Sequence, residues 1–227
     1  MKKLIILFSL MICSYFNVIS QTTEERKLKP FDKLKISSEV KVFLTKGAEE
    51  MVKIVATGIE LSEIETSVIG KTLTIELSRG IHMGVSIEIF VTYKQIRDIS
   101  VSSSGKLSVQ TPLVGDKVLI DASSNGEIDA ELNLNTVDLN IGQGGVIRLT
   151  GKTGSIDAKV STKGILSAID LKSDSTYVQV GTLGIAKVSA SYILESNVSM
   201  GGTLTYSGNP KVKNIKTGIG ATVNAIE

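Results

Sequence analysis

Cysteine, histidine and tryptophan are nearly absent from this chain of 227 residues: Cys13 and His82 are single residues of their kinds, and there is no tryptophan. Without a second cysteine a disulfide scaffold is excluded, so stability has to come from apolar burial and backbone pairing. A Ser-His-Asp site would have one candidate base, His82, which precedes the repeat described below and which we expect at the surface. The chain also lacks tryptophan platforms for sugar rings.

Long apolar runs are confined to the first 20 residues. MKKLIILFSLMICSYFNVIS begins with Lys2 and Lys3, continues with a short apolar stretch and ends in Ser20, which is the layout of a secretory signal peptide. A membrane-spanning helix needs roughly 20 apolar residues, and polar side chains interrupt this run. We expect a signal peptide over residues 1–20, cleavage after Ser20, and export through the inner membrane to the periplasm, the outer surface or the medium.

Lipid attachment at Cys13 is disfavoured, because Ile12 stands where a small residue is needed. Loss of Lys2 and Lys3 with the signal peptide lowers the formal net charge from +2 to 0. A net charge of zero gives no indication of a basic surface that would bind nucleic acid. We expect no transmembrane segment in the mature chain, and homo-oligomerisation stays open.

The mature chain divides by residue pattern. Residues 21–30, QTTEERKLKP, are polar and end in proline, which is typical of a flexible tether. Residues 31–95 alternate apolar with polar residues between turns, as in KLKISSEVKVFLT, and predict N-terminal strands. Glycine turns recur over residues 96–227. We expect one all-β domain over residues 31–227.

A repeat of 18–21 residues organises the second part of the chain. Its mark is a quartet that begins with Ser, Thr or Gly and ends with Gly. The quartets are SSSG, SSNG, GQGG, STKG, GTLG, SMGG and TGIG, which end at Gly105, Gly126, Gly145, Gly164, Gly184, Gly202 and Gly220.

Apolar residues keep fixed positions on both sides of these glycines. The column two residues after the glycine holds Leu107, Ile128, Ile147, Leu166, Ala186 and Leu204, and the column four before it holds Val101, Ala122, Ile141, Val160, Val180 and Val198. The residues between are mostly polar, although Lys216 breaks the pattern at the seventh quartet. Coils with one strand on each side of a turn would pair in parallel about 4.8 Å apart. The sequence therefore predicts a β-solenoid.

Together with the export signal, the opening FDKLKISSEVKVFLTKG and the glycine-ended quartets resemble the head GIN domain family, autotransporter-adhesin-like exported proteins of Bacteroidetes. The resemblance covers about Phe31 to Ala225. It implies a right-handed parallel β-helix of the pectin-lyase type and an adhesive role. It supplies no catalytic residues.

One stretch resembles a calcium loop. Its first, fifth and ninth positions are Asp121, Asn125 and Asp129, but its twelfth is Leu132 instead of a chelating glutamate. The competing explanation is a tight turn whose Asn125 and Gly126 tolerate a positive φ. We expect no metal and no other cofactor.

Two acids fall in one outward column of adjacent coils, Asp138 and Asp157. A carboxylate pair would serve a polysaccharide hydrolase or lyase. The alternative is a solvated face with Lys159 alongside, as in the cross-strand pairing expected between Asp129 and Arg148. Nothing else clusters around the pair, so we expect no catalytic residues.

The repeat contains three tyrosines. Tyr206 occupies an inner column and should pack in the core, whereas Tyr177 and Tyr192 are the candidates for exposed contacts. These features favour an exported, non-enzymatic β-helix that binds a cell-surface protein or glycan. The alternatives are a polysaccharide lyase or hydrolase of the pectin-lyase type and an envelope scaffold that binds protein partners.

Overall fold

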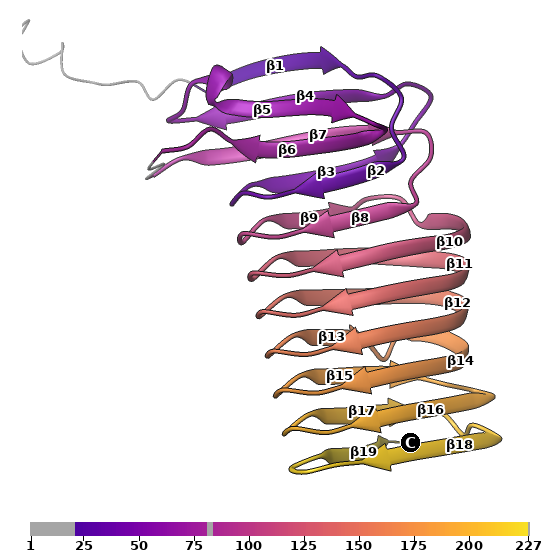
Figure 1. Ribbon diagram of the computed structural model, residues 1–227. Coiled ribbons are helices and arrows are strands. Elements are labelled where there is room, and N and C mark those ends of the chain that lie inside the picture. The colour runs from indigo at the N-terminus through magenta and orange to yellow at the C-terminus, as the bar shows by residue number, and fades with distance from the viewer. Residues whose placement is uncertain (1–20, 81–83, 227) are drawn as a thin grey trace, which may run out of the picture.

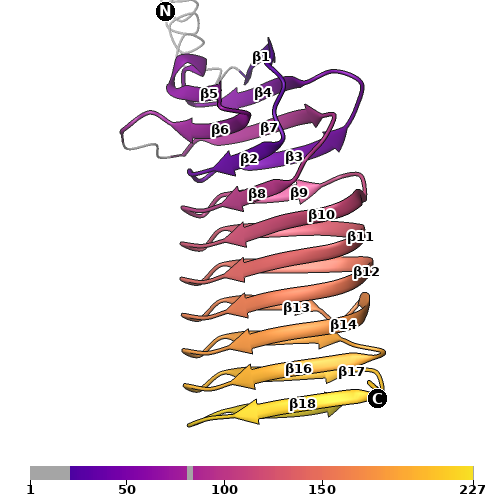
Figure 2. The same ribbon diagram turned by 45° about the vertical axis from the view of Figure 1, so that its right-hand side comes forward.

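The computed structural model describes residues 21–80 and 84–226, which form a tall stack of β-coils with an antiparallel cap at one end (Figures 1 and 2). The chain enters at the cap and descends through the coils. The strands of the stack are β8 (Asp98–Val101), β9 (Lys106–Val109), β10 (Leu113–Ala122), β11 (Glu127–Ile141), β12 (Val146–Val160), β13 (Ile165–Ala168), β14 (Leu171–Val180), β15 (Ile185–Ser189), β16 (Ile193–Val198), β17 (Thr203–Ser207), β18 (Val212–Thr217) and β19 (Thr222–Ile226).

Every coil pairs in parallel with its neighbours. Ile128 of β11, for example, lies in register with Ile147 of β12. The long strands β11 and β12 bend round a corner, so that their first residues pair with β9 and β13 and their last residues with β10 and β14. The predicted all-β solenoid of stacked coils is confirmed.

The inner columns form one continuous core. On one ladder Ile120, Leu139 and Ala158 follow one another in register and are at most 1% exposed. The residues of the two inner columns predicted for the first six turns are all buried. Burial of one aliphatic side chain contributes about 1.5–3 kcal/mol, so the columns are the main source of stability.

Each of the first six turns places two consecutive residues in the left-handed region. In the second turn Ser124 and Asn125 have φ values of 46° and 61°, and Gly126 N donates to Ser123 O over 2.8 Å. This geometry is a type I′ turn. The tight turn is therefore present, with Asn125 in the left-handed region; the second left-handed residue is Ser124 and not Gly126.

Gly126 meets a requirement for space instead. A Cβ on it would overlap the carbonyl oxygen of Val101 in the preceding coil. The turns approach closely because they also stack through backbone bonds, such as that from Asn125 N to Gln143 O at 3.1 Å. The other turn glycines that meet a carbonyl of the preceding coil are Gly145, Gly164, Gly184 and Gly202.

The seventh turn lies one residue later than the sequence pattern predicts. Ala221 N donates to Gly218 O over 3.2 Å, and Thr222 pairs with Thr203, so the turn is GIGA and not TGIG. Lys216 then faces outward beside Asn197 instead of breaking an inner column.

The cap comprises β1 (Gln21–Lys27), β2 (Lys33–Ile36), β3 (Lys41–Lys46), β4 (Met51–Thr57), the 3-10 helix η2 (Leu61–Glu63), β5 (Ile64–Ile69), β6 (Thr72–Leu77) and β7 (Ser86–Tyr93). Strands β1, β4 and β7 pair antiparallel, as do β5 and β6. Strands β2 and β3 pair in parallel with β6 and β7 on one side and with β8 and β9 on the other. The coil formed by β2 and β3, the first in the sequence, therefore lies between two pairs of strands that come later in the chain, β6 with β7 and β8 with β9.

Residues 21–30 were expected to form a flexible tether, and this expectation is wrong for β1. The strand pairs with β4 along its whole length. Arg26 also donates to Leu61 O at 3.0 Å and Ile64 O at 2.8 Å, which ties β1 to η2 and β5. Backbone pairing and one arginine thus order a segment that has no buried apolar residue.

The expected signal peptide over residues 1–20, including Cys13, and the candidate base His82 lie outside the described residues. Within residues 21–80 and 84–226 no helix is long and apolar enough to cross a membrane.

Candidate ligand-binding face

The outer side of three neighbouring strands near the end of the stack carries polar side chains around one tyrosine. We call the tyrosine face a set of six outward residues of β14, β16 and β18: Tyr177, Gln179, Glu195, Asn197, Asn214 and Lys216. Tyr177, Glu195 and Asn214 lie in register, and the other three form a parallel row two residues nearer the turns. The alternation of each strand sets these positions, since the residues between them face the core.

A shallow hollow of about 280 Å³ lies on this face. All six residues of the tyrosine face line it, and Asp157 of β12 closes one side. A second hollow of about 280 Å³ shares Gln179 and Asn197 and extends toward the turns. Tyr177 is 38% exposed, so part of its surface is open to a ligand.

The chemistry of the face suits a ligand with many hydroxyl groups. The amides of Gln179, Asn197 and Asn214 can each donate and accept hydrogen bonds. The carboxylates of Asp157 and Glu195 accept them, and the tyrosine ring supplies an apolar surface with a polar end. With two acids and one lysine, the face favours neutral over anionic groups.

The acids predicted to neighbour each other do so. Asp138 and Asp157 are register partners on β11 and β12. Lys117 Nζ lies 2.6 Å from Asp138 Oδ2, and its hydrogen bond to Asp138 raises the pKa of Lys117, with a further contribution from the charge of Asp157. The balancing lysine is therefore Lys117 of the preceding coil and not Lys159, which lies in register with Asn140 and Gln179.

The residues of the calcium-like stretch do not converge. Asp121 lies on the ladder of β8 and β10, Asn125 is in the turn, and Asp129 lies on the ladder of β9 and β11. Burial raises the pKa of Asp121, as does the charge of Asp98, while a hydrogen bond from Ser100 opposes them. Among residues 21–80 and 84–226 no three His, Cys, Asp or Glu side chains gather as a metal site would require.

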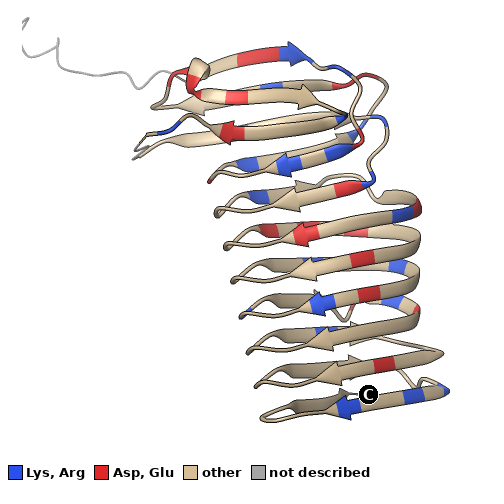
Figure 3. Ribbon diagram, viewed as in Figure 1, with Lys and Arg blue, Asp and Glu red and all other residues tan. Residues whose placement is uncertain are grey.

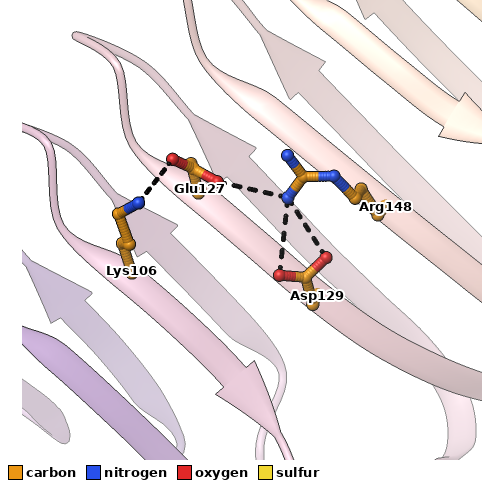
Figure 4. Close-up of polar contacts among 4 residues, drawn as sticks. All are labelled: Lys106, Glu127, Asp129 and Arg148. Carbon is orange, nitrogen blue, oxygen red and sulfur yellow. Dashed lines mark hydrogen bonds and ion pairs between the residues drawn. The ribbon is translucent and has the colours of Figure 1, made fainter.

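Charged side chains on the other ladder form a chain across three coils (Figure 4). Lys106 Nζ lies 2.9 Å from Glu127, and Arg148 Nη1 lies 3.2 Å from Glu127 and 3.3 Å from Asp129. The hydrogen bond from Lys106 and that from Arg148 lower the pKa of Glu127. The predicted pairing of Asp129 with Arg148 is confirmed, and it occupies Asp129 with a structural contact.

The three tyrosines lie as predicted. Tyr206 is 7% exposed and packs in the core, where its hydroxyl receives a hydrogen bond from Lys213 Nζ at 3.4 Å. Tyr192 is exposed, but Lys211 Nζ lies 5.4 Å from its ring centre. Tyr177 is exposed and lines the hollow on the tyrosine face.

The amides around Tyr177 were not singled out from the sequence. Gln179, Asn197 and Asn214 match no motif. They could be recognised only by comparing the outward positions of successive coils. Aligning those columns by the same glycine turns would have placed Gln179 beside Asn197.

Several solved structures have a similar fold. A putative adhesin from Bacteroides fragilis superimposes with a TM-score of 0.78 at 18% identity, over 91% of this chain and 97% of that one. A putative adhesin from Parabacteroides distasonis gives 0.74 at 19% identity, over 91% and 97%. A protein from the same species described as a putative lipid binding protein gives 0.67 at 17%, over 92% and 97%. At such identities the similarity concerns the fold.

No curated protein matches the chain. A family model described as "Putative auto-transporter adhesin, head GIN domain" matches residues 30–210, which is most of the sequence. The chain therefore belongs to this head GIN domain family.

Proposed function

We propose that the protein is an exported, adhesin-like β-solenoid that binds a neutral glycan of a cell surface on the tyrosine face and does not convert it. The observation that carries the proposal is the open ring of Tyr177, set among three amides and two carboxylates over a shallow hollow. The adhesin names of structural relatives support a binding role.

The proposal gives Asp138 and Asp157 no catalytic role. Lys117 holds Asp138 through a short ion pair, which gives this acid a structural partner. The proposal includes export to the periplasm, the outer surface or the medium, which rests on the expected signal peptide over residues 1–20.

The test is a binding screen of the protein starting at Gln21 against neutral and anionic polysaccharides. Tyr177→Ala should weaken binding to a neutral glycan about tenfold or more, because a central aromatic contact is lost. Tyr192→Ala is the matched control and should bind as the wild type does. Equal binding by the Tyr177 variant overturns the proposal, and so does glycan turnover that Asp138→Asn abolishes.

A further inference from the structure

The tips of the last three turns carry exposed apolar side chains. We call Leu183, Met200 and Ile219 the apolar tips; they are 56%, 66% and 91% exposed. The corresponding positions of the first four turns are mostly small or polar, and the second turn, for instance, has Ser124 and Asn125. The turns of one stack therefore carry mostly small or polar residues at their tips in the first four coils and apolar residues in the last three.

These side chains stand in a row along one edge of the stack. Leu183 N donates to Met200 O at 3.0 Å, and Gly201 N donates to Ile219 O at 3.1 Å, so the three turns lie directly on one another. Ile165 and Ile185, the first residues after the glycines of the fourth and fifth turns, are register partners and are each 38% exposed. The row of tips therefore continues into an aliphatic strip beside it.

Turn geometry does not account for the apolar tips. Leu183 and Met200 have φ values of 61° and 52°, a region that glycine and asparagine adopt far more easily than a bulky residue. Gly201 leaves room for the leucine, since a Cβ on it would lie 2.7 Å from Leu183 Cδ2. Strained, exposed and apolar residues together point to a contact made outside the molecule.

The charge beside the tips has one sign. From two residues before to three residues after the fourth to seventh turns, the chain has Lys159, Lys163, Lys187 and Lys216 and no acid. None of the four makes an ion pair with another residue of 21–80 or 84–226. Among the same segments of the first three turns, that of the second turn carries acids, and the cations beside the first and third turns, Lys106 and Arg148, pair with two of them, Glu127 and Asp129 (Figure 4). Figure 3 shows the distribution of both signs along the stack.

We propose that this edge docks on the surface of an anionic lipid bilayer, with the apolar tips inserted among the lipids and the lysines against the headgroups. Amphipathic surfaces that bind membranes combine these two elements. A bilayer surface has no fixed pockets, so a row of projecting apolar side chains can insert into it anywhere along the surface. The unpaired lysines are complementary to anionic headgroups. The inference goes beyond glycan binding and rests on different residues, apart from Lys216.

Sedimentation with vesicles tests the proposal on the protein starting at Gln21. It should bind vesicles of phosphatidylglycerol and phosphatidylethanolamine and leave phosphatidylcholine vesicles largely unbound, with binding that falls as salt rises. Replacing the three tips together by Asn should weaken binding about tenfold or more. The triple change Lys159→Gln, Lys163→Gln and Lys187→Gln should remove the salt dependence, and it leaves Lys216 of the tyrosine face intact.

The matched control removes apolar surface elsewhere. Ile69→Asn with Val114→Asn changes two side chains that are 77% and 61% exposed, and should bind as the wild type does. Asparagine tolerates left-handed φ, so the tip variant should keep its circular dichroism spectrum. Absence of wild-type binding to anionic vesicles, or equal binding by the tip variant, overturns the proposal. A tip-dependent dimer in light scattering without vesicle binding assigns the edge to a second copy instead.

Discussion

Gly126 faces the carbonyl oxygen of Val101 in the preceding coil with no room between them for a Cβ. The glycine at the end of each of the first six quartets therefore permits close stacking of coils, while its neighbours supply the left-handed conformation. Space for close stacking and a positive φ are thus required of different residues of the same turn. Substitutions can therefore test the two requirements separately.

Gly126→Ala should lower the free energy of unfolding by about 1–3 kcal/mol, because the new methyl group forces two coils apart. Urea unfolding followed by circular dichroism measures the change. Gly115→Ala is the matched control: the nearest atom to its Cβ is Leu134 Cδ2 at 4.0 Å, so it should be neutral or slightly stabilising. Equal destabilisation by both variants would contradict the role given to close stacking.

A buried hydroxyl weakens the core near the end of the stack. Ser196 occupies an inner column between Val178 and Ile215, and its Oγ has no hydrogen-bond partner among the described residues. Since an unsatisfied buried polar group costs about 1–3 kcal/mol, Ser196→Ala should raise the free energy of unfolding by about 1 kcal/mol. Thermal and urea unfolding give the measurement.

The control for this prediction is a buried hydroxyl that does have partners. Thr176 Oγ1 lies 3.0 Å from Ser173 Oγ and donates to Ser189 O at 2.8 Å. Thr176→Val should therefore lower stability by about 1–3 kcal/mol. A gain in both variants would show that any loss of polarity stabilises this core, which would contradict the argument from Ser196.

The repeat was predictable because it is a local pattern that recurs. Ile128 and Ile147 stand at one offset from their glycines, and parallel stacking turns equal offsets into register partners. The seventh turn was misplaced because Gly220 completes a plausible quartet, whereas the hydrogen bond from Ala221 to Gly218 fixes the turn one residue later. Pattern alone does not reveal which residue closes a turn.

The arrangement of the cap and of the candidate site could not be predicted, because both are set by contacts between segments whose spatial order the sequence does not reveal. Nothing in β2 indicates that it lies between β6 and β8, since chain order and spatial order differ there. Similarly, Lys117 and Lys159 both lie near Asp138 in the coil pattern, and only the 2.6 Å contact selects Lys117. The exposure of Tyr177 followed from its column, but its amide neighbours required the aligned strands.

Asp121 should make stability fall as the pH rises through the acidic range. Burial and the charge of Asp98 raise its pKa above that of the unfolded chain, so the folded state binds the proton more tightly. Between the two pKa values the folded form holds more protons, and stability declines with rising pH. Asp121→Asn should therefore raise the melting temperature at pH 7 and have little effect in strong acid.

Glu127 provides a control of opposite sign. Its pKa is lowered by Lys106 and Arg148, so its contribution to stability is present above the unfolded pKa and is lost as the pH falls through the folded one. Glu127→Gln should lower the melting temperature at pH 7, less so at high salt because the pairs are exposed. Shifts of the same sign in the two variants would refute the pKa directions.

Leu183→Asn should make the fold more stable while weakening the proposed membrane contact. A bulky side chain at φ 61° costs about 1–2 kcal/mol, and asparagine relieves much of this cost. A gain of about 1 kcal/mol corresponds to about 2–4 °C in melting temperature for a chain of this size. Differential scanning calorimetry gives the shift, and vesicle sedimentation of the same sample gives the binding. Ile69→Asn also removes an exposed aliphatic residue, but from a position without positive φ, and should bring no such gain. A melting temperature at or below that of the wild type would mean that the leucine stabilises its own turn, which would remove the strain argument for an external contact.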